Sequence, residues 1–341
     1  GLSLMALGNA ESQSPEQLIG EAEAAVLQIA DKRSKDSPED SETIGRLLYQ
    51  EYARSEEAHE RGTSMLGLST GLPGIDRLTS GLQSPDFWVL AGRPGCGKTS
   101  LLLHMALHVA LQEHRPVALF SLEMSKEQYA LRIACMLARL DSHKLRMGDL
   151  TQDEWDRYAL AVQECYSLPL VINDSPGCTI AELSSVIRRI RRDYNDLAFV
   201  GVDYLQLMSA KSGSENRTQA VSELSRDLKS IARQERVPLM ALSQLSRSVE
   251  SRENKRPLLS DLRESGSIEA DSDLVAFLYN ESYYARLRNS ETVITERTTD
   301  EVEFIVAKHR NGATGNIRIG FQPTYTRFAD MTLRDDEPTG F

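Results

Sequence analysis

The sequence has few cysteines and no long apolar segment. Its 341 residues include four cysteines, none of them in a CxxC pair, so neither a disulfide framework nor a zinc site is indicated. No stretch approaches the roughly 18 consecutive apolar residues of a membrane span, and the N-terminus lacks the basic and then apolar pattern of a secretory signal. We therefore expect a protein of a reducing, cytoplasmic compartment that has no membrane partner.

Positive charge is also scarce, with 39 Lys and Arg against 50 Asp and Glu and a formal net charge of -11. The deficit is concentrated in residues 1–62, which hold 13 acidic and 6 basic residues, a balance of -7. The rest of the chain therefore carries only -4. A local cationic channel is compatible with that balance, so the net charge excludes neither DNA nor RNA as a partner.

Residues 1–62 are predicted to form a linker helix and a helical arm. The sequence SPEQ at 14–17 combines a capping serine, a proline suited to the first helical turn and a glutamine that closes a capping box. A polar stretch at 32–42 follows, and a second amphipathic stretch covers about 43–60. The first helix presents one apolar stripe, which packs either on its own domain or on a neighbouring subunit; its members are Leu18, Ala22, Ala25 and Ile29.

Residues 63–333 are predicted to form one α/β domain, followed by a flexible tail at 334–341. Short runs that are apolar on both faces alternate with helix-length segments, which is typical of a mostly parallel sheet buried between helices. The segment 301–328 instead predicts an antiparallel hairpin with its turn at 311–315. The five expected parallel strands are 87–92, 116–122, 168–173, 197–203 and 237–243.

The sequence GRPGCGKT at 92–99 matches the phosphate-binding pattern GxxxxGK[ST], between an apolar strand and a helix-like segment. Its glycines allow successive amides to turn inward around phosphates, Lys98 suits β- and γ-phosphate oxygens, and Thr99 suits Mg²⁺. A chance glycine-rich turn is the alternative, and Cys96 is interpreted as a small filler rather than a nucleophile. The predicted nucleotide-binding residues are Gly92, Arg93, Pro94, Gly95, Cys96, Gly97, Lys98, Thr99 and Ser100.

Three further polar residues follow expected strands. Asp203 closes the run LAFVGVD and is the candidate Walker B acid, which would hold Mg²⁺ together with Thr99. Glu123 follows the strand at 116–122 and can polarise an attacking water, although an acid that starts a helix is an alternative interpretation. Gln244 follows the run VPLMALS and can report the γ-phosphate through hydrogen bonds.

Taken together, six segments resemble the motor domain of replicative DNA helicases of the DnaB type in both order and spacing. The resemblance runs from about residue 66 to residue 330, and the SPEQ helix resembles the linker helix of that family. The segments are GRPGCGKT (92–99), SLEMS (121–125), VDYLQLM (202–208), ALSQLSR (241–247), SDLRESGSIEADSDL (260–274) and AKHRNG (307–312).

This resemblance implies a RecA-like fold, a homohexameric ring around single-stranded DNA, and ATP-driven translocation that unwinds the duplex ahead of a replication fork. It implies that Lys98 and Thr99 hold phosphate and Mg²⁺, that Glu123 is the catalytic base, that Asp203 is the Walker B acid and that Gln244 couples to the γ-phosphate. Each of these roles agrees with the chemistry inferred from the residues themselves.

The resemblance alone implies two further functional groups. Lys308 and Arg310 match the cations that reach the γ-phosphate bound to the adjacent subunit, whereas without the resemblance they indicate a solvated hairpin tip. Arg263, Glu264 and Gly266 match the segment that follows the DNA backbone in a sequence-independent manner, with Glu264 expected to shape the loop.

Other basic residues are assigned less specifically. Those of the polar stretches 209–218 and 246–257 either line the same channel or are ordinary charged loops. The basic run at 188–192 is interpreted as a solvated helix face. The residues of the two polar stretches are Lys211, Arg217, Arg247, Arg252, Lys255 and Arg256.

Members of this family carry an additional N-terminal helical domain that contacts primase, and the residues before 14 are too few to form it. We therefore expect a motor with its linker helix, whose assembly is a closed ring or an open filament. A helicase loader and primase are expected partners of a full-length protein. The competing functions are a RecA-like recombinase or ATPase, and a nucleotide-dependent scaffold that oligomerises without hydrolysis.

Overall fold

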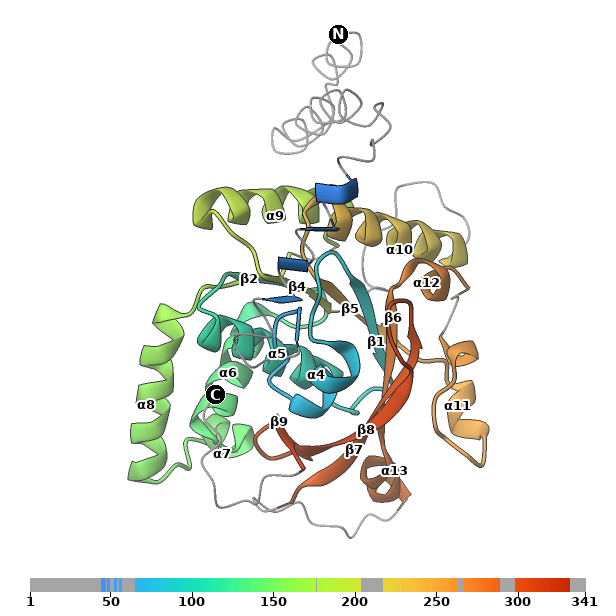
Figure 1. Cartoon of the computed structure of the whole chain (residues 1–341). Coiled ribbons are helices and arrows are strands. Elements are labelled where there is room, and N and C mark those ends of the chain that lie inside the picture. The colour runs from blue at the N-terminus through green and yellow to red at the C-terminus, as the bar shows by residue number, and fades with distance from the viewer. Residues whose placement is uncertain are drawn as a thin grey trace, which may run out of the picture.

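The computed structural model describes residues 44–46, 48–49, 52–53, 55–56, 65–175, 177–203, 217–262, 266–288 and 298–331 (Figure 1). The predicted linker helix at 14–29 and the predicted tail at 334–341 lie outside these residues. The described residues between 44 and 56 are helical, in agreement with the amphipathic stretch predicted there. Ile44, Leu48 and Tyr52 form an exposed apolar stripe on this segment.

One mixed sheet organises the domain, in the order β3-β2-β4-β5-β1-β6-β7-β8-β9. The strands from β3 to β6 in this order are parallel to their neighbours, and β7 to β9 continue the sheet in antiparallel fashion. The bounds are β1 (Phe87–Gly92), β2 (Val117–Ser121), β3 (Leu170–Asn173), β4 (Phe199–Asp203), β5 (Leu239–Gln244), β6 (Leu274–Asn280), β7 (Asp300–His309), β8 (Gly315–Gln322) and β9 (Arg327–Asp330).

The predicted fold class is therefore confirmed, with the five expected parallel strands and the hairpin in place. Two strands were not predicted. β6 is an apolar run of the same kind as the others, and it joins the parallel part of the sheet to the hairpin. β9 is a four-residue edge strand, too short for its pattern to stand out.

Helices cover both faces of the sheet, as Figure 1 shows. α4, α5 and α6 pack on one face, and α9, α10 and α12 pack on the other. The helix bounds are α4 (Pro73–Thr79), α5 (Lys98–Gln112), α6 (Lys126–Ala138), α7 (Ser142–Met147), α8 (Gln152–Ser167), α9 (Ile180–Tyr194), α10 (Arg217–Gln234), α11 (Ser248–Ser251), α12 (Gly266–Asp271) and α13 (Glu281–Arg288).

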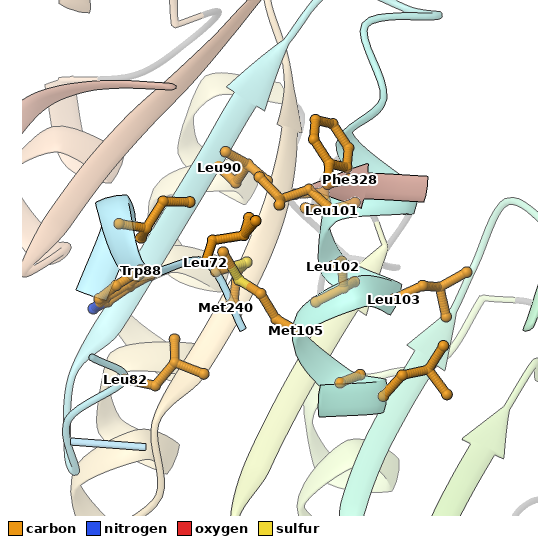
Figure 2. Packing of buried hydrophobic residues seen from close by; sticks show 14 of the residues in the cluster. Leu72, Leu82, Trp88, Leu90, Leu101, Leu102, Leu103, Met105, Met240 and Phe328 are labelled. Carbon is orange, nitrogen blue, oxygen red and sulfur yellow. The ribbon is translucent and has the colours of Figure 1, made fainter. Parts of the chain in front are cut away.

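Alternation along β1 shows how this core is built. Trp88 and Leu90 point to the α5 side, whereas Phe87, Val89 and Ala91 point to the side of α9 and α10. Figure 2 shows Leu101 of α5 beside Leu90 and Phe328, and Met105 of α5 beside Met240, in the first of these layers. Both faces of the central strands are thus buried, which explains their continuous apolar runs.

Among the described helices, none is both long and apolar enough to cross a membrane.

We predict that Gly201→Ala destabilises the domain by about 1–3 kcal/mol, because the added methyl overpacks the core. A Cβ at Gly201 of β4 would stand 2.7 Å from side-chain atoms of Leu102 and Leu119. Urea unfolding followed by circular dichroism measures the change. Gly315→Ala is the matched control, because its Cβ meets Leu78 at an ordinary 3.5 Å. Equal midpoints for the two variants would contradict the prediction.

Candidate active site

Four strand ends place the predicted chemical groups together. Gly92, the last residue of β1, pairs with Gln244 of β5, and Ser121 of β2 pairs with Asp203 of β4. Since β2, β4, β5 and β1 are consecutive neighbours and run parallel, all four strands end at one edge of the sheet. One site therefore contains the phosphate loop, the candidate Walker acid Asp203, the candidate base Glu123 and Gln244.

The phosphate loop has the backbone conformation that the glycines predict. Gly95 and Gly97 have φ angles of +80° and +93°, and Gly97 caps α5, whose first residue is Lys98. A Cβ on Gly95 would stand 2.6 Å from the ring of Tyr283, and a Cβ on Gly97 would stand 3.0 Å from the ring of Phe328. The rings of Tyr283 and Phe328 therefore pack against the loop, which leads directly into the N-terminus of α5, a position suited to phosphate.

Lys98 is held inside the loop. Its Nζ donates a hydrogen bond of 3.1 Å to the carbonyl oxygen of Arg93, and burial lowers the pKa of the amine. The negative charges of Asp203 and Glu123 act in the opposite direction on this pKa, so both acids lie within electrostatic reach of the lysine. Cys96 is 1% exposed, and burial raises the pKa of its thiol. This environment suits the predicted filler, since a nucleophile needs a thiolate.

Arg93 ties the phosphate loop to the segment that follows β5. Its Nη1 donates to the carbonyl oxygen of Leu245 at 2.9 Å, and its Nε donates to Glu250 Oε1 at 2.8 Å. The arginine is 11% exposed and the glutamate 46%, so the ion pair lies at the rim of the site. Because Leu245 directly follows Gln244, the last residue of β5, this contact holds the phosphate loop next to the end of β5.

Asp203 is almost completely enclosed, with 2% of its surface exposed. Its Oδ2 accepts hydrogen bonds of 2.8 Å from the hydroxyl groups of Thr99 and Tyr129. The pairing of a carboxylate with the last threonine of the phosphate loop fits Mg²⁺, which takes few protein oxygens and keeps waters and substrate phosphates as its other ligands. Within the described residues, no three His, Cys, Asp or Glu side chains group into a metal cage.

Glu123 lies on the short turn between β2 and α6. It is exposed, whereas the turn that carries it is fixed by Ser121, whose hydroxyl donates to the Met124 carbonyl oxygen. The capping box of α6 follows at once, with Ser125 as its first member. This placement is compatible with both interpretations of Glu123, since it precedes a helix and its charge also acts on Lys98.

Lys308 and Arg310 lie at the other edge of the sheet. Arg310 N donates to the carbonyl oxygen of Asp273, and Asp273 in turn is hydrogen-bonded to Phe87 at the start of β1. The phosphate loop begins five residues later at Gly92, about 16 Å along the strand. Arg310 is therefore far from the phosphate loop of its own chain, and the bonds of the Lys308 amine to Glu269 and Ser272 direct that amine to the same end of the sheet.

Both cations bind the end of α12 in this chain. Lys308 Nζ donates to the carbonyl oxygens of Glu269 and, at 2.8 Å, Ser272. Arg310 donates to Ala270 O at 2.9 Å and to Asp273 Oδ1 at 3.2 Å. Burial lowers the pKa of Lys308, and the neighbouring Arg310 acts in the same direction. The hairpin tip is thus not simply solvated.

Of the residues predicted to contact DNA, Arg263 and Glu264 lie outside the described residues, and Gly266 is the exposed first residue of α12. Lys211 also lies outside them, and Arg217 begins α10. Arg247 directly precedes α11.

The basic run of α9 agrees with the predicted helix face, since Arg192 is exposed beside Asp193 and Arg191 pairs with Glu235. Three loop cations have partners within the chain, in the contacts Arg252–Asp261, Arg256–Glu303 and Lys255 over the Tyr284 ring.

Sequence patterns did not reveal three residues of the site. Tyr129, Glu250 and Tyr283 come from helices that have no motif of their own, and only the folded chain brings them to the phosphate loop and Asp203. The apolar setting of Tyr129 within α6 is typical of core packing, and Glu250 resembles many other surface acids.

The fold and the site define a P-loop NTPase of the RecA-like class, in which a mostly parallel sheet presents a phosphate loop and a buried acid at its carboxyl edge. The family model described as DnaB-like helicase C terminal domain matches residues 67–330. The chain belongs to this family.

Individual relatives of known name agree with this family assignment. The replicative DNA helicase DnaC of Bacillus subtilis (strain 168) is 38% identical over 331 residues, 97% of this chain and 70% of the relative. The replicative DNA helicase DnaB of Geobacillus stearothermophilus is 38% identical over 321 residues, 94% of this chain and 68% of the relative.

Two solved structures share the fold. A solved ATPase domain has a TM-score of 0.77 and 33% identity, and the match covers 86% of this chain and 100% of that chain. A DnaB-like replicative helicase, described with its interactions with primase, has a TM-score of 0.74 and 31% identity, with 96% of this chain and 75% of that chain covered.

We predict that Glu250→Ala weakens nucleotide binding about twofold to fivefold, the range for a partly exposed ion pair. The change removes the carboxylate that orients Arg93 and leaves the Leu245 contact in place. Titration with a fluorescent ADP analogue measures the affinity. Glu253→Ala removes an exposed acid from the same segment and is the control. An affinity equal to that of the control would show that the ion pair does not support the loop.

Proposed function

We propose that this replicative helicase motor hydrolyses ATP at the subunit interfaces of a hexameric ring and uses the energy to translocate on single-stranded DNA and unwind duplex. The observation that carries the proposal is the separation of the two halves of the site. The phosphate loop lies at the carboxyl edge of the parallel strands, and Lys308 and Arg310 lie beside the amino edge. A complete site then needs two copies of the chain.

The roles proposed within one subunit rest on the residue types and on their place at the carboxyl edge of the sheet. Lys98 and the amides of residues 95–99 bind the β- and γ-phosphates. Thr99 and Asp203 would hold Mg²⁺, which supplies positive charge that neutralises the phosphate oxygens. Glu123, exposed at the mouth of the site, accepts the proton of the attacking water, and Gln244 hydrogen-bonds to the γ-phosphate.

The neighbouring subunit supplies the remaining charge. Arg310 stabilises the charge that develops on the transferred phosphoryl group, and Lys308 binds the same phosphate. A head-to-tail interface of this kind closes into a ring when its rotation permits. The exposed stripe of Ile44, Leu48 and Tyr52 supports assembly as well, because such a stripe on the arm is stabilised when a neighbouring copy covers it.

The DNA contact is proposed for the segment Arg263, Glu264 and Gly266, which lies between β5 and α12 in the chain. Residues 63–333 form the motor in this proposal, 1–62 its linker arm and 334–341 a tail. One structural neighbour is described with its interactions with primase. Primase and a helicase loader are the protein partners that we propose for the full-length protein, in the cytoplasm.

We predict that Glu123→Ala lowers ATP turnover about a hundredfold or more while nucleotide affinity stays unchanged, because it removes the base and leaves the phosphate loop intact. Steady-state ATPase assays and nucleotide titration measure the two quantities. Glu127→Ala removes a nearby exposed acid and is the control. Unchanged turnover would overturn the role of Glu123 and favour a non-hydrolysing scaffold.

A mixing experiment tests action across the interface. Arg310→Ala and Lys98→Ala subunits, each inactive alone, should regain part of the ATPase when combined. Random equal mixing gives about a quarter of the head-to-tail interfaces an intact Lys98 on one side and an intact Arg310 on the other. In the control, Arg310→Ala subunits are mixed with subunits that carry both substitutions. No activity should return, because no subunit then has an intact Arg310. Assembly without recovery, with the mass of the mixed complex measured, would contradict the proposal.

A further inference from the structure

Tyr129 is a buried hydroxyl donor beside the candidate Walker acid. It lies in the first turns of α6 and is 0% exposed, and its hydroxyl donates to Asp203 Oδ2 at 2.8 Å. Burial raises the pKa of Tyr129 well above its usual value, and the charge of Asp203 adds to this effect. A phenol is protonated at neutral pH, and the geometry of this contact makes it the donor.

Two donors converge on one oxygen of this carboxylate. Thr99 Oγ1 also donates to Asp203 Oδ2, at 2.8 Å, so Oδ2 is fully engaged by neutral hydroxyl groups. Within the part of the chain that the structure describes, no hydrogen bond reaches Oδ1. A carboxylate fixed in this way is held by two separate segments of the chain, and Oδ1 is left for another partner.

The two donors come from elements that belong to different parts of the site. Thr99 belongs to the phosphate loop and α5, and Tyr129 belongs to α6, which follows the turn of Glu123. The hydroxyl of Tyr129 therefore joins the helix after the candidate base to the end of β4. The chain places a buried polar group here, although an apolar side chain would fill the same core position without a hydrogen-bond requirement.

We infer that Tyr129 is a positioning residue that fixes the orientation of the Asp203 carboxylate for the magnesium-nucleotide complex. This inference rests on the proposed function, because it takes Asp203 as the acid that holds the cation. Residues that orient a metal-binding carboxylate change metal affinity when they are removed, even though they touch no metal. Tyr129 acts through Asp203 in this way, and the phosphate loop itself does not depend on it.

The test is a magnesium titration of Tyr129→Phe, which keeps the ring and removes the hydroxyl. A fluorescent ADP analogue is bound in EDTA and at increasing Mg²⁺, and ATPase is measured over the same range. We expect the half-saturating Mg²⁺ concentration to rise about tenfold, with the affinity in EDTA unchanged. Tyr129→Met, which fills the space with a flexible apolar chain, is measured alongside and should behave in the same way.

Controls separate positioning from packing. Tyr158→Phe removes a hydroxyl from α8, away from the site, and should leave the magnesium curve unchanged. An unchanged curve for Tyr129→Phe would overturn the inference, and so would an equal loss of affinity with and without Mg²⁺, which would indicate a packing role alone.

Asp203→Asn distinguishes this inference from the proposed function. If Asp203→Asn abolishes the magnesium response and Tyr129→Phe does not shift it, the inference about Tyr129 fails and the site stands. If Asp203→Asn leaves the response intact, the proposed magnesium site itself fails. When both variants weaken the response, adding Tyr129→Phe to Asp203→Asn should cause no further loss, because the tyrosine works through that carboxylate.

Discussion

Hydrogen bonding between parallel neighbours is the constraint on which the site depends. The pairs Gly92 with Gln244 and Ser121 with Asp203 fix where each strand ends, and a shift of one residue in either register would turn a catalytic side chain into the core. Side-chain contacts then refine the arrangement. Arg93 joins the phosphate loop to the segment after β5, and Tyr129 joins α6 to the end of β4. The chemistry is therefore positioned by backbone pairing first and by buried polar contacts second.

The same sheet polarity that gathers these groups also divides the machinery. β6 is parallel to β1, and β7 returns antiparallel to it, so the cations at the end of β7 arrive beside the start of β1. The length of β1 then separates them from the phosphate loop of their own chain. In the proposed function, the charge of Lys308 and Arg310 therefore comes from another subunit, and hydrolysis depends on assembly.

Much of this site could be predicted because its parts are local in sequence. GRPGCGKT carries its own strand, turn and helix start, and Glu123, Asp203 and Gln244 each follow an apolar strand. Contacts between elements could not be predicted in this way. Tyr129 and Asp203 are separated by 74 residues, and Arg93 and Glu250 by 157, so neither pair leaves a spacing that marks it. β6 was not predicted either, although its run LVAFLYN is apolar like the runs of the other strands.

α12 lies between two groups of residues to which the proposed function gives separate roles. Its first residue, Gly266, belongs to the segment proposed to follow DNA, and the carbonyl groups at its other end bind Lys308 and Arg310. A cation at a helix C-terminus is stabilised by the helix dipole, so these side chains occupy favourable positions before any neighbour's phosphate is bound. In the proposed function they contact that phosphate from the end of a helix whose first residue, about 9 Å away along the helix axis, is Gly266.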